Sequence, residues 1–297
     1  MQIFSSWTVY TIIAVAILYV LIEIVYELNT FVITRYKITS KKLDSSKRGI
    51  KIAYLSDMHN HEYGKDNNKL LNAIKSERPD VIILGGDMIV AKNGRKDYEH
   101  TLEFVKKLPE IAPVYYGCGN HEKRMREQVE KYGNAFDIYT KALEKAGVIY
   151  LENGNESFEC NGQQIEIAGI DLPTSVYRRP RNFKLAMEEI TACNAQLQTE
   201  KYQILMAHHP DYAKLYREWG ADLTLAGHFH GGVARLPKIG GIISPQIDIL
   251  PRYSGDCYQV DGGHIVVSKG LGTHTVNLRF WNRAELIMIQ LDGEEGK

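Results

Sequence analysis

The hydrophobic pattern divides the chain into one long apolar run near the N-terminus and a body of shorter, alternating segments. From Trp7 to Tyr26 the only charge is Glu23, and this run of about 20 residues is long enough to cross a hydrocarbon core of about 30 Å. Trp7, Tyr10 and Tyr26 lie near its ends, where aromatic rings favour the headgroup level. The pattern predicts a transmembrane helix within residues 1–28, which makes the lipid bilayer a partner.

Two other interpretations of this run stay open. A buried helix of the soluble fold would show an apolar face with a period of 3.6, whereas this run is apolar all round. A signal peptide of an exported enzyme would have a basic residue before the run and a small-residue cleavage site after it, and the sequence has neither.

A basic segment, 29–48, follows the apolar run. Its Lys and Arg residues stand against a lone Asp44, and such positive flanks stay in the cytoplasm. We therefore expect a juxtamembrane segment in a single-pass protein of the cell membrane, with the body on the cytoplasmic side. The same basic residues suit contact with anionic headgroups.

After Gly49 the pattern changes to short β-branched runs separated by amphipathic stretches. Strands alternating with helices, followed by a strand-rich final third, predict an α/β fold whose sheet is covered on both sides over much of its area. No linker interrupts this body, so residues 49–297 are expected to form one domain. Strands are predicted at 50–55, 81–84, 114–116, 164–170, 202–207, 223–226, 265–268 and 285–291, and helices at 67–76, 98–108, 122–146, 183–196 and 212–219.

Composition and charge narrow the function classes. Lys and Arg number 36 and Asp and Glu number 36, so the chain has no basic excess and no nucleic-acid partner is expected. The four cysteines lie far apart without a CxxC pair, which indicates reduced thiols rather than a disulfide framework or a zinc ribbon. Nothing in the sequence identifies a protein partner.

Five of the predicted strands end in clusters of carboxylate, imidazole or amide side chains. Ligands of α/β sheets bind outside the carboxyl ends of the strands, so these distant clusters are expected to converge. Their mix of hard oxygen and borderline nitrogen donors suits Mn²⁺, Fe or Zn²⁺ better than Ca²⁺ or a thiolate site. The clusters are Asp57-Met-His59, Gly86-Asp87, Gly119-Asn120-His121-Glu122, His208-His209 and Gly227-His228-Phe229-His230.

The order of these motifs resembles the calcineurin-like metallophosphoesterase superfamily, in its bacterial membrane-anchored branch. The resemblance runs from about residue 50 to 291. It implies a layered αββα sandwich of two mixed β-sheets flanked by helices. It also implies an enzyme that hydrolyses a phosphomonoester, phosphodiester or pyrophosphate bond with two divalent metal ions.

The resemblance further implies two groups of ligands joined by Asp87, the bridging carboxylate. The ligands of the first ion are Asp57, His59 and His230. The ligands of the second ion are Asn120, His208 and His228. Two cations about 3.5–4 Å apart need a shared anion, and a hydroxide held between them is activated to attack phosphorus at neutral pH. His121 matches the catalytic histidine, and we expect it to assist the leaving group.

Three further residues are candidates for substrate binding. Phe229 replaces the Thr found in many relatives, and two interpretations stay open: an apolar wall against the substrate or packing on the sheet. Arg178 and Arg179 belong to a basic stretch, 177–184, that suits a second phosphate or the membrane surface, or is a solvated face. His209 is expected to point away from the ions, because consecutive side chains of a strand face opposite ways.

The substrate is open within the phosphate esters. A lipid-linked pyrophosphate such as UDP-2,3-diacylglucosamine is a hypothesis that combines the anchor with the resemblance. The alternative function is a membrane-tethered, non-catalytic metal-binding interaction module with the same fold. Such modules tend to lose His or Asn from the site, whereas here every expected position is filled.

Overall fold

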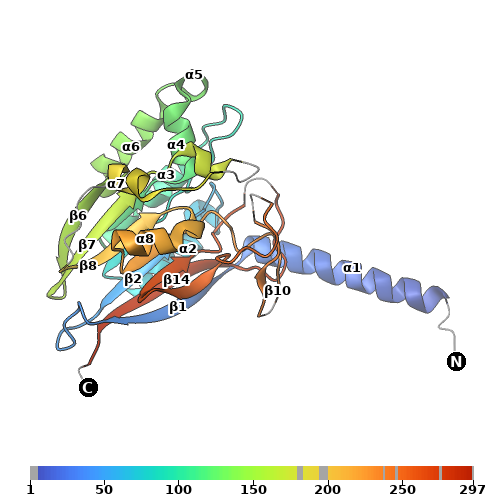
Figure 1. The fold of residues 1–297 in the computed structure, drawn as a ribbon. Helices are drawn as coiled ribbons and strands as arrows, with labels where there is room; N and C mark the ends of the chain where they lie inside the picture. The colour runs from blue at the N-terminus through green and yellow to red at the C-terminus, as the bar shows by residue number, and fades with distance from the viewer. Residues whose placement is uncertain are drawn as a thin grey trace.

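Two six-stranded mixed sheets pack face to face, with helices on their outer faces, in the computed structural model (Figure 1). The structure describes residues 6–178, 183–193, 200–236, 238–244, 247–273 and 276–295. The first sheet has the order β1 (Phe31–Ser40), β14 (Ala284–Gly293), β2 (Ile50–Leu55), β3 (Val81–Leu84), β4 (Val114–Gly117) and β5 (Val148–Leu151). The second has the order β12 (Asp256–Val260), β13 (Gly263–Val267), β9 (Leu223–Ala226), β8 (Tyr202–Ala207), β7 (Gln163–Ile170) and β6 (Gly154–Cys160). This confirms the predicted α/β sandwich.

The core between the sheets is formed by β-branched and aromatic side chains of both. Ile52 and Ile83 of the first sheet and Ile167, Ile204 and Leu225 of the second belong to one buried cluster. Because these central strands are covered on both faces, they carry near-continuous apolar runs, which is why the sequence located them well.

Helices cover the two outer faces. A second buried cluster joins the first sheet to α2 (Asn68–Glu77), α3 (Glu99–Val105), α4 (Asn120–Glu127), α5 (Val129–Tyr132) and α6 (Ala135–Lys145). A third joins the second sheet to α7 (Met187–Cys193) and α8 (Ala213–Trp219). The 3₁₀ turns are η1 (Lys65–Asn67), η2 (Leu108–Glu110), η3 (Thr174–Tyr177) and η4 (Pro210–Tyr212), and a small hairpin joins β10 (Arg235–Leu236) to β11 (Gly240–Gly241).

The N-terminal helix α1 (Ser6–Asn29) projects from the body as a separate rod (Figure 1). Among the residues described, the stretch Trp7–Asn29 is the one helix that is long and apolar enough to cross a membrane, and its apolar window has no part buried in the body. Thr30 alone separates α1 from β1.

The segment 29–48 is not a separate juxtamembrane stretch, which corrects the predicted domain boundary. Most of it forms β1, an edge strand that pairs in parallel with β14 from Phe31 opposite Ala284 to Ser40 opposite Gly293. Apolar side chains of β1, such as Ile38, pack into the core, while the alternate positions carry the basic residues. The body therefore begins at β1 rather than at Gly49.

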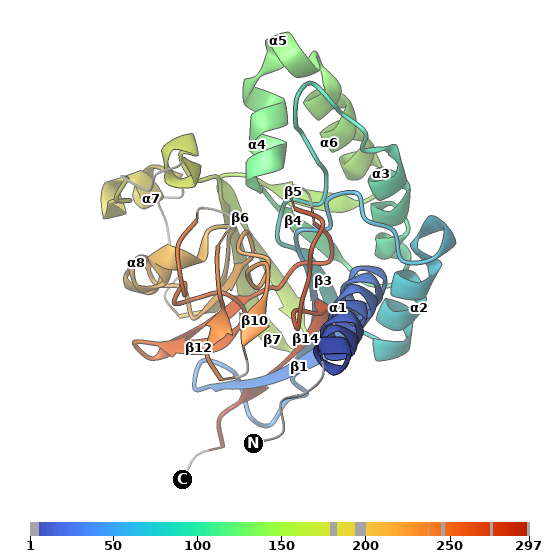
Figure 2. The same ribbon diagram turned by 90° about the vertical axis from the view of Figure 1, so that its right-hand side faces the viewer.

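Strand register places the candidate site near the base of α1. Tyr54, close to the carboxyl end of β2, lies opposite Ile287 of β14, and Ala284 of the same strand lies opposite Phe31. The carboxyl end of β2 therefore lies beside the start of β1, where α1 ends. Figure 2 views the molecule along α1 and shows this end of the body around the helix.

Candidate metal centre

The candidate ligands occupy loops that leave the carboxyl ends of β2, β3, β4, β8 and β9. Several of them adopt the left-handed backbone conformation that non-glycine residues rarely take. Such positions cost about 1–3 kcal/mol each and persist only when the surroundings fix them, as at functional sites. The φ angles are 51° at Asp57, 48° at His59, 51° at Asp87, 66° at His228 and 51° at His230.

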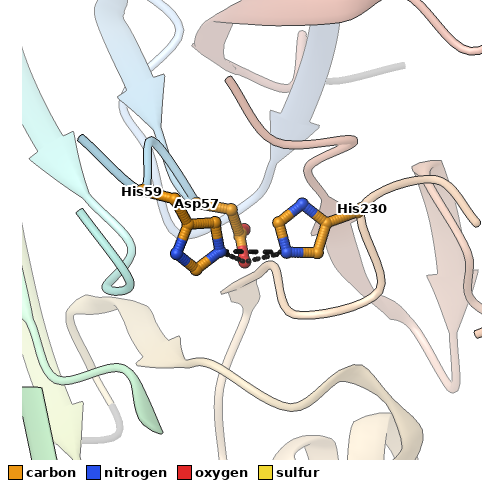
Figure 3. Close-up of side chains that lie close together, drawn as sticks. All are labelled: Asp57, His59 and His230. Atoms are coloured by element: carbon orange, nitrogen blue, oxygen red, sulfur yellow. Dashed lines mark hydrogen bonds and ion pairs between the residues drawn. The ribbon is translucent and has the colours of Figure 1, made fainter. Parts of the chain in front are cut away.

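Asp57, His59 and His230 form the first group of ligands, and their side chains point toward one another (Figure 3). His59 Nε2 lies 3.0 Å from His230 Nε2, and Asp57 Oδ1 lies 3.5 Å from His230 Nε2 and 4.0 Å from His59 Nε2. His230 Nδ1–H donates to the carbonyl of Gly272 at 3.0 Å, so the Nε2 lone pair faces the group. Three donor atoms thus converge.

Asp87, His208 and His228 form the second group. His208 Nε2 lies 3.2 Å from Asp87 Oδ2, and its Nδ1–H donates to the carbonyl of Gly85 at 2.9 Å. His208 Nε2 is also 3.6 Å from Asp57 Oδ1, and Asp87 Oδ2 is 3.9 Å from His59 Nε2. The two groups are therefore neighbours, and Asp87 lies between them.

The position of Asn120 tests whether this centre suits a cation. One terminal atom of its amide lies 2.9 Å from His228 Nδ1 and 3.3 Å from Asp87 Oδ2. In the absence of an ion the amide nitrogen satisfies both contacts by donating to them, whereas the amide oxygen at that position would face Asp87 Oδ2 and a His228 Nδ1 lone pair, three acceptors that a cation between them would stabilise. The donor set of the two groups, carboxylates, imidazoles and one amide, suits a borderline divalent ion. The residues present therefore fit a pair of divalent cations.

Burial and the mutual charges of the two groups shift their pKa values. Burial raises the pKa of Asp57 to about 6, although His208 and hydrogen bonds from Ser56 and His228 oppose the rise. Burial also acts to raise the pKa of Asp87, but His208, His121 and His59 hold it well below its usual range. Burial acts to lower the pKa of His208, and the two carboxylates raise it to about 10.

His121, the predicted catalytic residue, is buried in the first turn of α4 beside both groups. A ring nitrogen of His121 and ligand atoms of His59 and Asp87 lie within 4.8 Å of one another. His121 Nδ1 accepts a hydrogen bond from the backbone N–H of Ala91 at 2.9 Å. The neutral ring therefore carries its proton on Nε2 and can act as a hydrogen-bond donor there.

Glu122 is a positioning residue, which the sequence analysis named only as the last member of the cluster that begins at Gly119. Its carboxylate is buried and accepts hydrogen bonds from the backbone N–H groups of Asp87 at 2.8 Å, Met88 at 3.0 Å and Gly119 at 3.2 Å. The Tyr116 hydroxyl also donates to it, at 2.6 Å. Glu122 thus fixes the loops after β3 and β4 together. Its place directly after His121, in the first helical turn, was the available signal.

Two residues near the C-terminus hold the loop of His230, and no sequence motif marks them. Asn282 Nδ2–H donates to the carbonyl of His230 at 2.7 Å and also to that of Gly232. Arg279 is buried and donates to Gly272, the carbonyl that His230 Nδ1–H also contacts, at 2.9 Å. They come from a segment between β13 and β14 whose sequence shows no periodicity.

Three candidates for substrate binding remain. Phe229 has no exposed surface, and its ring lies 5.2 Å from that of His209, which favours packing over the apolar wall, the two interpretations that the sequence left open. Its position between two ligands in a tightly packed loop explains the burial. Arg178 is exposed at the end of η3, next to Tyr177, whose ring lies 5.0 Å from that of His228. Arg179 lies outside the described residues.

Comparison with known proteins agrees with this geometry. A family model described as "Calcineurin-like phosphoesterase" matches residues 50–232, which include every candidate ligand. The uncharacterized metallophosphoesterase YkuE of Bacillus subtilis is 28% identical over 87% of this chain and 84% of its own length. The phosphodiesterase YaeI of Escherichia coli is 26% identical over 81% of this chain and 82% of its own.

Among solved structures, the phosphopantetheinyl hydrolase of Mycobacterium tuberculosis matches 75% of this chain and 89% of its own, with a TM-score of 0.45 and 14% identity. The family match covers more than half of the chain. The chain therefore belongs to the calcineurin-like phosphoesterase family and is a metallophosphoesterase.

Proposed function

We propose that this protein is a membrane-anchored phosphoesterase with two divalent ions in the candidate metal centre. The observation that carries the proposal is the pair of ligand groups joined at Asp87. Asp57, His59 and His230 would hold one ion, and Asn120, His208 and His228 the other, with Asp87 between them. Mn²⁺, Fe and Zn²⁺ all suit this donor set.

When bound, two such ions supply an activated water at neutral pH and neutralise charge on the phosphoryl oxygens. The chain supplies the rest of the chemistry. Its buried loops fix the ligands, and Glu122 keeps the loops of Asp87 and His121 in register. His121 Nε2–H would donate a hydrogen bond to the leaving oxygen and stabilise its developing charge, with Nδ1 oriented by the Ala91 N–H, and the leaving oxygen would take its proton from water. Loss of one such donor typically costs about 10²–10³ in kcat.

The test compares the full chain with His121→Ala under Mn²⁺, with bis-p-nitrophenyl phosphate as substrate. We expect the variant to keep both ions by elemental analysis and to lose about 10²–10³ in kcat, the share of one hydrogen-bond donor to the leaving oxygen. Asp87→Asn is expected to lose metal as well as rate. A non-catalytic module would give no turnover by the unmodified chain with any metal or substrate, and that outcome contradicts the proposal.

For the physiological substrate we propose a lipid-linked pyrophosphate such as UDP-2,3-diacylglucosamine. Two features support it: the apolar helix α1, and the position of the metal centre at the end of the body where α1 emerges (Figure 2). An active site at the membrane surface can reach a substrate whose acyl chains stay in the bilayer. Release of UMP from this substrate, compared with bis-p-nitrophenyl phosphate at equal concentration, tests it. Faster hydrolysis of the soluble diester contradicts it.

A further inference from the structure

Exposed apolar side chains gather in loops beside α1. Outside α1, the exposed large apolar residues of the described chain fall mostly between 236 and 281, with Val129, Ile138 and Ile149 as the exceptions. Ile249 is 76% exposed, Ile247 67% and Trp281 46%. Six of these residues form what is called here the apolar loop surface: Ile239, Ile243, Ile247, Ile249, Leu250 and Trp281. A soluble face rarely carries such a concentration without a binding role.

Backbone contacts join these loops into one unit. Phe280 pairs with Ala234 in a parallel bridge, and its carbonyl accepts from the N–H of Arg235 at 3.1 Å. Ile243 pairs with Ile249 in an antiparallel bridge. The rings of Phe280 and Trp281 stack at 4.9 Å. The apolar side chains therefore belong to loops that backbone bridges join to one another, next to the loop that holds His230.

Contacts with α1 fix the depth of this surface. Trp281 Nε1–H donates to the Tyr19 hydroxyl at 3.3 Å, the guanidinium of Arg283 lies over the Tyr26 ring at 5.2 Å, and the N–H of Asn282 donates to Glu27 at 2.9 Å. Tyr19 precedes the end of α1 at Asn29 by ten residues, about 15 Å along a helix. Trp281 thus lies alongside the apolar part of α1 rather than beyond it, and the backbone bridges connect the other loops to its segment.

We propose that the apolar loop surface inserts into the interfacial layer of the bilayer that α1 spans; this rests on the membrane anchoring proposed above. If the run from Trp7 to Tyr26 fills the hydrocarbon core, Trp281 at the level of Tyr19 must lie within the membrane. The exposed isoleucines then contact acyl chains, which is favourable by about 25 cal/mol for each Å² of apolar surface removed from water. Lys238 and Arg252 belong to the same loops and are exposed, as suits anionic headgroups.

The consequence for the enzyme is a metal centre that opens at the membrane surface. The backbone carbonyl of His230 accepts a hydrogen bond from the side chain of Asn282. Asn282 belongs to the same loop as Trp281, so this loop connects the centre to the apolar loop surface. The substrate class that this arrangement favours is an amphiphile with its phosphoester at headgroup level. A soluble phosphoester has no need of the apolar loop surface.

The test measures contact between these loops and lipid in the full-length chain. With Trp7→Phe and Trp281→Phe, the remaining tryptophan is Trp219, which is buried in the body. Ile249→Trp then places a reporter on the apolar loop surface, and Ile138→Trp places a matched reporter on α6, far from α1 (Figures 1 and 2). Each protein is reconstituted in phosphatidylcholine–phosphatidylglycerol vesicles with and without acyl-brominated lipid.

We expect bromine to quench the Ile249→Trp reporter by about half, because interfacial side chains reach about 5–10 Å into the headgroup–acyl boundary. The Ile138→Trp reporter should keep its fluorescence. Ile247→Trp provides a second reporter if the first variant fails to fold. Equal emission from both loop reporters with and without bromine overturns the proposal. The measurement needs no turnover, so an inactive enzyme would refute the proposed function without affecting this result.

Discussion

At the residue scale, the metal centre is a buried set of groups with opposing protonation tendencies. Asp87 is held ionised by the imidazoles around it, whereas His208 is held protonated by the carboxylates. An ion that takes the Nε2 lone pair of His208 must displace that proton. Metal binding and proton release are therefore linked at this position.

This linkage predicts that metal affinity rises with pH. The pKa of His208 is raised to about 10, so below that value its ring binds a proton that competes with the ion. One competing proton weakens binding about tenfold for each pH unit lowered. Below pH 6 the metal affinity falls more steeply with decreasing pH, because Asp57, whose pKa is raised to about 6, then binds a second competing proton. Mn²⁺ titration calorimetry at pH 5.5, 6.5, 7.5 and 8.5 measures the slope, and a flat profile contradicts the assignment of His208 as a ligand.

A second prediction concerns Asn282, which donates to the backbone carbonyls of His230 and Gly232. Asn282→Ala removes the donor to the His230 carbonyl. Residues that orient metal ligands typically contribute about 10–100-fold to affinity, so one of the two ions should bind that much more weakly. Metal content after dialysis measures it, with Asn277→Ala, an exposed neighbour, as the control. Full retention of both ions by Asn282→Ala argues against the role.

At the element scale, β1 shows how a strand can be hidden in a sequence. Its outward positions carry Arg35 and Lys37, which made the segment resemble a basic membrane flank. Its partner β14 lies some 250 residues away, so no local pattern indicates the pairing. The strands that carry the ligands were predicted well because both their faces are buried and their ends carry Asp or His. The edge strands β1, β6 and β12 lack that signal.

The strand nature of β1 gives a stability prediction. Ile38 is 2% exposed and packs in the core between the sheets. Ile38→Ala should lower the free energy of unfolding of the body by about 2–5 kcal/mol, the range for large-to-small core substitutions. Thr39→Ala, at the neighbouring exposed position, should change it little. Denaturant unfolding followed by tryptophan fluorescence measures the free energy of unfolding of both variants. Equal losses in the two variants would contradict the packing of β1 in the core and favour a separate juxtamembrane segment.

At the scale of the whole molecule, the sequence located the metal centre but not its surroundings. The motifs of Asp57, Asp87, Asn120 and His228 follow strands whose carboxyl ends lie at one edge of the sandwich, which is why the sequence could group them. Arg279 and Asn282 escaped prediction, since their contacts depend on where an irregular loop folds back. The choice between the two interpretations of Phe229 depended on tertiary context in the same way. Tertiary context decides such positions, and no spacing rule indicates them.

Orientation across the membrane is the prediction at this scale. The basic residues after α1 and the free cysteines favour a cytoplasmic body. A C-terminal tag should therefore resist protease added to intact cells and be removed after permeabilisation. A tag already cleaved in intact cells would instead indicate an exported body.

The connection between α1 and β1 has a consequence for how the enzyme searches for substrate. A single residue, Thr30, joins the anchor to a strand that is hydrogen-bonded along its whole length to β14. This junction leaves no flexible linker between the helix and the sheet. With α1 in a bilayer, as proposed above, the candidate metal centre would stay at one height above it, and a lipid-linked substrate would be met only by lateral diffusion in two dimensions.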